Sequence, residues 1–75
     1  MADDPGEDLT ERQERILACI RETIAAFGEA PSVREISLYV GMRSKSGVHY
    51  QLRQIEKKGR IVIEPGRDRG IRLAR

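Results

Sequence analysis

The chain has 75 residues, which is enough for one small domain and too few to enclose a deep catalytic cleft beside its core. Residues 1–42 carry four Arg against nine Asp and Glu (−5), whereas residues 43–75 carry ten Lys and Arg against three acids (+7). One Cys, one His, an acidic start and no apolar run of 18 residues exclude an intramolecular disulfide, a metal site, a targeting peptide and a membrane span, so we expect a cytoplasmic protein without cofactors.

The N-terminal part is expected to hold a short arm and one long helix. Residues 1–8 have no large apolar side chain after the first residue, which predicts a disordered arm before a single domain at 9–75. Thr10 and Gln13 are spaced as a capping box that starts the helix, and Gly28 ends it because glycine adopts the left-handed conformation at no steric cost. Five apolar residues at helical spacing predict one stripe: Ile16, Leu17, Ile20, Ile24 and Phe27.

A second, shorter helix opens at Ser32, which is spaced to form a capping box with Glu35, and stops at Gly41. Its buried face is predicted to consist of Val33, Ile36 and Val40. Leu38 points about 160° away from that face at 100° per residue, so we expect it to be exposed. Single exposed leucines are normal, and the alternative is a small protein-contact patch made with Tyr39.

A third helix follows Ser44 or Ser46, since either serine can cap it, and runs to Lys58 with Gly59 after it. Its buried stripe is predicted to be Val48, Leu52 and Ile55. The opposite side of the helix then carries Ser46, Tyr50, Arg53 and Lys57, with His49 and Gln54 at its edges.

This polar face has hydroxyl, imidazole, phenol, amide and cationic groups and no carboxylate, which favours contact with base edges or phosphates. An ordinary solvent face is the alternative. Gly47 in the first turn would let the backbone approach DNA closely. The helix N-terminus, beside Ser44 and Lys45, suits a phosphate, although Ser44 also serves as a cap or turn residue. Arg53 adds a cation to the same surface.

The last elements are two short strands in which Ile61, Ile63, Ile71 and Leu73 alternate with other residues. Arg67 and Arg69 lie in the loop between them, where they can reach a phosphate backbone or minor groove, although hairpin tips are also commonly basic for solubility. Two helices joined by a tight turn and followed by a hairpin predict a mainly α winged helix-turn-helix fold, with three helices and a two-stranded wing.

Five segments, in this order and spacing, carry a family resemblance: LTERQ at the first cap, APSVREI entering the second helix, VGMRS at the turn, SKSGVHYQLRQIEKKG along the third helix and RGIRL closing the wing. From Leu9 to Leu73 the chain resembles the N-terminal DNA-binding domain of the LexA repressors of the bacterial SOS response. The resemblance implies sequence-specific binding of double-stranded DNA at a palindromic operator. It also implies base reading by Ser44, Ser46, Gly47, His49 and Tyr50, and backbone contact by Lys58.

LexA repressors continue into a C-terminal domain that holds a Ser–Lys self-cleavage dyad and the dimer interface, whereas this chain stops at Arg75. The sequence is therefore either an excised domain or a short protein that kept the DNA-reading part. We expect the free chain to be monomeric, with two copies on one operator, and we expect no self-cleavage.

Two other classes of function compete with DNA binding. A protein-interaction module would dock a partner through Leu38 and Tyr39, and its basic half would be incidental. The charge of +7 on residues 43–75 and the polar face of the third helix argue against it, and a steep fall in DNA affinity with salt would discriminate between the two. An enzyme is not expected, because the single His49 lies on the polar helix face and the Ser residues have cap or turn explanations.

Overall fold

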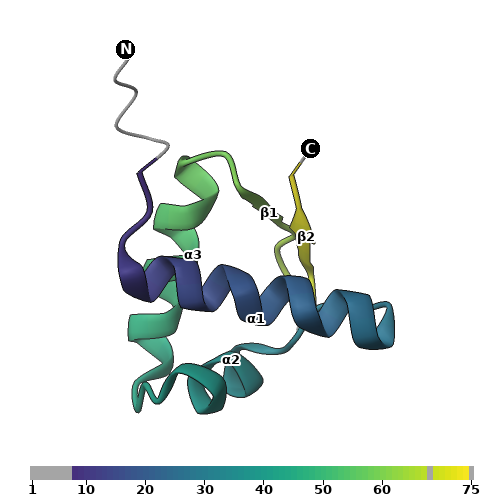
Figure 1. Ribbon diagram of the computed structural model, residues 1–75, viewed down its shortest axis with the longest axis horizontal. Helices are drawn as coiled ribbons and strands as arrows, with labels where there is room; N and C mark the ends of the chain where they lie inside the picture. Colours follow the sequence, from purple (N-terminus) through teal and green to yellow (C-terminus); the bar gives the residue numbers. More distant parts are fainter. Residues whose placement is uncertain (1–7, 68, 75) are drawn as a thin grey trace.

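The computed structural model describes residues 8–67 and 69–74, and within them it contains three helices followed by an antiparallel hairpin (Figure 1). The elements are α1 (Glu11–Phe27), α2 (Val33–Val40), α3 (Lys45–Lys57), β1 (Ile61–Ile63) and β2 (Ile71–Leu73). In the hairpin the partners are Ile61 with Leu73, Val62 with Arg72 and Ile63 with Ile71. This order confirms the predicted three helices and two-stranded hairpin. The predicted disordered arm, apart from Asp8, lies outside the described residues.

Side-chain caps set the start of each helix. Both predicted capping boxes are present, in Thr10 with Gln13 and in Ser32 with Glu35. The cap of α3, left open between two serines, is Ser44, whose Oγ accepts the Gly47 N–H at 3.2 Å. Ser46 instead shares a 2.8 Å hydrogen bond with the Ser44 hydroxyl. Loss of such a cap typically costs about 1 kcal/mol of stability.

The turn between α2 and α3 begins at Gly41, which has a φ of 74°. This left-handed conformation reverses the chain, and the Met42 N–H then bonds back to the Ser37 carbonyl at 2.9 Å. Only residues 41–44 separate the two helices, so α3 is held directly against α2. A short connection of this kind is what the helix-turn-helix pattern required.

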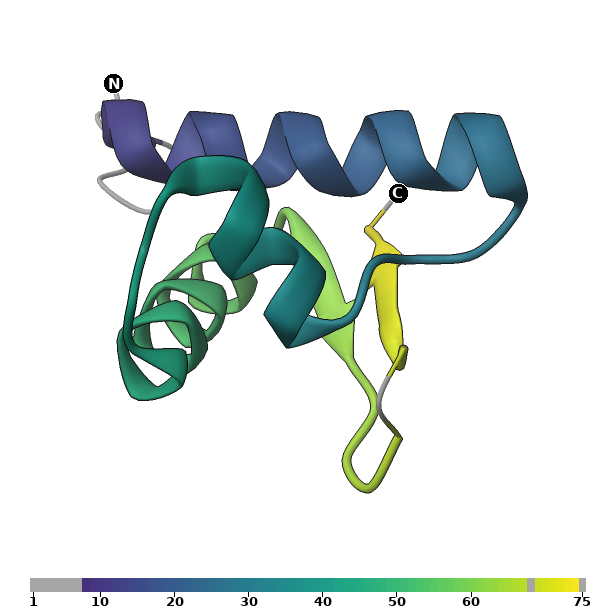
Figure 2. The same ribbon diagram turned by 90° about the horizontal axis from the view of Figure 1, so that it is seen from below.

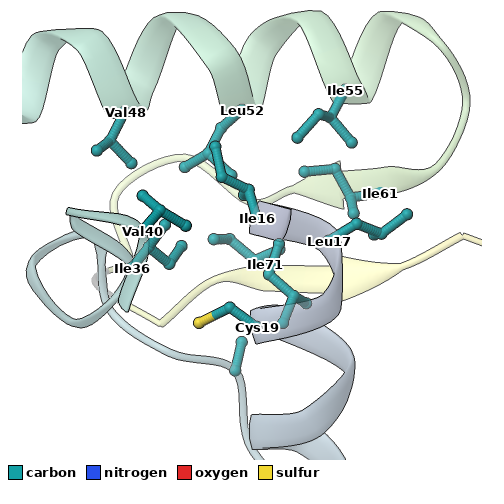
Figure 3. Close-up of a cluster of buried hydrophobic side chains, with 12 residues drawn as sticks. Ile16, Leu17, Cys19, Ile36, Val40, Val48, Leu52, Ile55, Ile61 and Ile71 are labelled. Atoms are coloured by element: carbon teal, nitrogen blue, oxygen red, sulfur yellow. The ribbon is translucent and has the colours of Figure 1, made fainter. Parts of the chain in front are cut away.

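The core lies where the three helices meet the hairpin, as Figure 3 shows. Its buried members include most of the predicted helix stripes together with one residue from each strand: Ile16, Leu17, Ile20, Ile36, Val40, Val48, Leu52, Ile55, Ile61 and Ile71. Cys19 and Ala30 are buried with them. Val33, predicted for the buried face of α2, and Ile24, predicted for the stripe of α1, are only partly buried.

The prediction that Phe27 belongs to the buried stripe of α1 is wrong, because the residue is 77% exposed and does not join the core. Its angular position on the helix is compatible with the stripe, so the reason is length. Seventeen residues rise about 25 Å, which is further than the layer that covers them. Figure 2 shows the C-terminal end of α1 extending past α2 and the hairpin. The last turn therefore lies beyond the core.

Candidate nucleic-acid interface

α3 presents the polar face that its sequence predicted. Its buried side consists of Val48, Leu52 and Ile55, all at most 2% exposed. On the other side Ser46, His49, Tyr50, Arg53 and Lys57 are exposed, and Gln54 is half-buried. In Figure 2, α1 runs along one side of the molecule, while α3 and the hairpin loop both lie on the opposite side. The exposed face of α3 and the loop tip are thus available to one and the same ligand.

The N-terminus of α3 is an electropositive end. Residues 45–48 include no acid, and Lys45 is exposed beside the capping Ser44. Unpaired N–H groups of a first helical turn carry a partial positive charge. The hydroxyls of Ser44 and Ser46 lie 2.8 Å apart at this end. The arrangement offers hydroxyl and amide groups together with a cation to an anionic ligand.

A groove joins α3 to its neighbours on the side of the hairpin loop. It is lined by Ser32, Val33 and Arg34 at the start of α2, by Lys45 and His49 of α3, and by Arg67 of the hairpin loop. Three cations from three different elements therefore surround one hollow, and none of these lining residues is acidic. Such a concave, cationic surface suits a phosphate backbone.

Arg34 is a member of this groove that the sequence analysis did not single out. It was counted with the acidic half of the chain, where its charge is outnumbered. The sequence could have indicated Arg34 through its position two residues after the Ser32 cap. A residue there lies in the first turn of α2, and in a helix-turn-helix unit that turn is close to the helix that enters the groove. The structure brings it beside Lys45 and Arg67.

Gly47 is half-buried rather than fully exposed. A Cβ added there would lie 3.0 Å from Met42 Cε and 3.8 Å from Ser44 Cβ. The side of Gly47 that lacks a side chain therefore faces the turn between the helices. A small residue here allows the turn to pack against α3, and the close approach of the backbone to DNA stays a prediction.

Lys58 lies at the end of α3, with its ammonium directed toward α1. Its Nζ donates to Gln13 Oε1 and to the Asp8 carbonyl, both at 2.6 Å. The buried Gln13 also donates from Nε2 to Gln51 Oε1 at 3.0 Å. These bonds join the start of α1 to α3, so the Lys58 ammonium already has a structural role within the domain.

Arg67 and Arg69, for which the sequence predicted the same contact with DNA, differ in their surroundings. Arg67 has a side chain that is 70% exposed and lies 3.4 Å from a Glu64 carboxylate oxygen. Arg69 instead reaches α2, where its Nη1 donates to Glu35 Oε1 at 2.7 Å and its Nη2 to Glu35 Oε2 at 2.9 Å. Its Nη1 also donates to the Ala30 carbonyl at 3.1 Å.

The acids of the basic half are engaged within the domain where the structure describes them. Glu64 lies beside Arg67 and also pairs with Arg72 at 3.0 Å. Glu56 accepts the Ile63 backbone N–H at 3.0 Å. Glu64 is thus charge-paired, whereas Glu56 keeps its charge and lines a hollow together with His49 and Arg53 of α3.

Leu38 is 74% exposed, which confirms the prediction that it points away from the core. Tyr39 is 47% exposed, and its hydroxyl donates to Glu22 Oε1 of α1 at 3.0 Å. The Glu22 carboxylate raises the pKa of the Tyr39 phenol, because it accepts this hydrogen bond and repels the phenolate. The role of these two side chains in partner binding stays a prediction.

Residues 8–67 and 69–74 hold no group of three or more His, Cys, Asp or Glu that could bind a metal ion. Within the same ranges, no helix combines the length and the apolar character needed to span a bilayer.

Two packed helices joined by a four-residue turn, with a third helix behind them and a hairpin beside them, define a winged helix-turn-helix domain. The chain matches the family model of the LexA DNA binding domain over residues 6–70. It therefore belongs to the LexA DNA-binding domain family, as its resemblance predicted.

Individual relatives agree with this assignment. The chain is 44% identical over 66 residues to LexA repressor 2 of Nocardia farcinica, 46% over 65 residues to the LexA repressor of Methylococcus capsulatus and 43% over 69 residues to that of Azoarcus sp.. These matches cover 88%, 87% and 92% of this chain but 27%, 32% and 34% of the relatives. The chain thus spans about a third of the length of the curated relatives that it matches.

Proposed function

We propose that this domain binds double-stranded DNA in a sequence-specific manner, with α3 in the major groove, and acts as the DNA-reading part of a LexA-type transcriptional repressor in the bacterial cytoplasm. The observation that carries the proposal is the cationic groove between α2, α3 and the hairpin loop, which adjoins the exposed polar face of α3. A major groove admits one helix, and phosphates flank it on both sides.

The residues divide by the chemistry of their side chains. Base reading falls to Ser44, Ser46, Gly47, His49 and Tyr50, which offer hydroxyls, an imidazole, a phenol and a bare backbone to base edges. Phosphate contact falls to Lys45, Arg53 and Arg67, to which we add Arg34 because it lines the same groove. Lys58 and Arg69 are left out of the contact set, because their cationic groups make short hydrogen bonds inside the domain, at 2.6 and 2.7 Å, whereas Arg67 only approaches Glu64 at 3.4 Å.

The proposed assembly on DNA is supported by family precedent. The relatives are repressors by name, and family precedent implies palindromic operators, which match a pair of domains related by twofold symmetry. We propose that the free chain is a monomer and that two copies occupy two half-sites. No catalytic role is proposed, since His49 is assigned to DNA contact.

The test is selection of bound duplexes from random DNA by the 75-residue chain, followed by affinity measurements over a range of salt concentrations. We expect enrichment of a half-site repeated in inverted orientation. The logarithm of the binding constant should fall steeply with the logarithm of salt concentration, by about 0.9 for each phosphate neutralised. Recovery of random sequences with a flat salt dependence would refute the proposal.

The substitution Arg34→Ala tests the proposed phosphate contact of Arg34, which the sequence alone did not predict. It should weaken binding to all duplexes and reduce the salt slope by about one, as expected for the loss of one phosphate contact. Arg21→Ala is the matched control, because it removes the same charge from an exposed position on α1 outside the groove. If both variants change the slope equally, Arg34 acts only through net charge.

A further inference from the structure

The hairpin is attached to both helices of the helix-turn-helix unit by carboxylates. On α2, Glu35 holds Arg69 through two parallel hydrogen bonds of 2.7 and 2.9 Å. On α3, Glu56 accepts the Ile63 N–H of β1 at 3.0 Å. Strands of three residues form a marginal hairpin by themselves, so contacts from outside decide where the loop lies.

The contact on α2 is built into the start of that helix. Glu35 Oε1 also accepts the Ser32 N–H at 3.0 Å, so the carboxylate is held in place by the capping box. Arg69 adds a third bond, from Nη1 to the Ala30 carbonyl at 3.1 Å. A planar guanidinium bound at several points by a fixed carboxylate has a defined orientation, which a single surface ion pair lacks.

The loop between the strands transmits this constraint to Arg67. The Glu64 N–H donates to the Gly70 carbonyl at 2.8 Å and closes the base of the loop. A Cβ on Gly70 would lie 2.7 Å from the Glu64 carbonyl oxygen and 2.9 Å from Arg67 Cβ, so the chain is tightly packed at this point. Fixing Arg69, next to Gly70, therefore restricts where the loop and Arg67 lie.

We propose that Arg69 is a positioning residue for DNA binding, which pairs with Glu35 to hold the wing so that Arg67 faces the groove lined by Arg34 and Lys45. The inference rests on the proposed function and assigns Arg69 a different role from that of Arg67. Arg67 contacts phosphate, whereas Arg69 lowers the conformational cost of presenting Arg67.

The substitution that separates the two roles is Glu35→Gln. Gln is itself favoured at this position of a capping box, so the start of α2 is kept. If Arg69 positions the wing, Glu35→Gln weakens binding, by about two- to fivefold as for loss of an exposed ion pair. If Arg69 contacts phosphate directly, the same substitution releases its guanidinium, removes a negative charge and strengthens binding.

Affinities are measured with the duplex returned by the selection and with a scrambled duplex, for Glu35→Gln, Arg69→Ala and Arg67→Ala. We expect Arg69→Ala to weaken binding to a similar extent as Glu35→Gln with a salt slope near that of the wild type, and Arg67→Ala to reduce the slope by about one. Stronger binding by Glu35→Gln, or a slope reduced equally by Arg69→Ala and Arg67→Ala, would overturn the inference.

A measurement without DNA separates failure of this inference from failure of the proposed function. Nuclear magnetic resonance follows the Glu35 carboxyl titration and the exchange of the Glu64 amide in the free protein. We expect Glu35 to titrate well below its ordinary range in the wild type and to return toward that range in Arg69→Ala, in which the Glu64 amide exchanges faster than in Arg67→Ala. Ordinary titration of Glu35 in the wild type would overturn the positioning role alone. Absence of DNA binding by the wild type would overturn the proposed function.

Discussion

Tyr50 offers the sharpest test of base reading, because its ring is 61% exposed on α3 and the core does not depend on it. Tyr50→Ala should therefore change the free energy of unfolding by no more than about 0.5 kcal/mol, the usual range for exposed positions. If the phenol contacts a base edge, the loss in binding free energy on the selected duplex should be about 1–3 kcal/mol. That corresponds to about a 5- to 150-fold weaker affinity.

The assay is fluorescence anisotropy with two duplexes of equal length, one selected and one scrambled. A base-reading side chain loses affinity mainly for the selected duplex, whereas a phosphate contact loses similar amounts on both. Tyr50→Phe separates the hydroxyl from the ring, and His49→Ala should behave like Tyr50→Ala. Equal losses on the two duplexes would show that Tyr50 does not read sequence, and thermal melting of each variant checks that the fold is intact.

Three further predictions concern stability, pH and assembly. Ile16→Ala, at a fully buried position, should cost about 2–5 kcal/mol in chemical denaturation, whereas Phe27→Ala should cost less than about 0.5 kcal/mol; similar costs would contradict the exposure of Phe27. Hydrogen bonds from Arg69 and from the Ser32 backbone lower the pKa of Glu35 from 4.5 to about 2, so its ionised form contributes stability above about pH 4.5 that is lost as the pH falls toward 2. Arg69→Ala should reduce that acid-dependent loss, and an identical pH profile would count against the pair. Leu38→Glu should leave both a monomeric sedimentation coefficient and DNA affinity unchanged; a dimer that this substitution dissociates would instead identify Leu38 as an interface residue.

Local rules were sufficient to predict the helices. The capping boxes at Thr10 and Ser32 depend on residues three positions apart, and the buried stripe of α3 depends on residues three and four apart. Such patterns are visible in any sequence. The choice between Ser44 and Ser46 as the cap of α3 was not, because both hydroxyls have suitable neighbours and only the backbone conformation distinguishes them.

The errors and omissions concern contacts that are distant in the chain. Phe27 has the right angular position for burial, but the length of the layer packed against α1 is a property of the other elements. Arg67 and Arg69 are two residues apart in a basic loop, and only the fold brings a Glu35 carboxylate to one of them from 34 positions away. A count of charge along the chain could not single out Arg34, because its cationic neighbours in space come from α3 and the hairpin loop.

The net charge of +2 therefore understates the attraction between this domain and DNA. Glu35 and Glu64 are paired with arginines, and the acids in the first turn of α1 lie on the side of the molecule opposite the hairpin loop. The first turn of α1 lies beside the C-terminal end of α3, where Lys58 bonds to Gln13, whereas the groove lies beside Lys45 at the start of that helix. In the proposed complex, a duplex at α3 experiences the local field of the groove, and that field is set by which residues the fold brings together and not by the balance of charge along the chain.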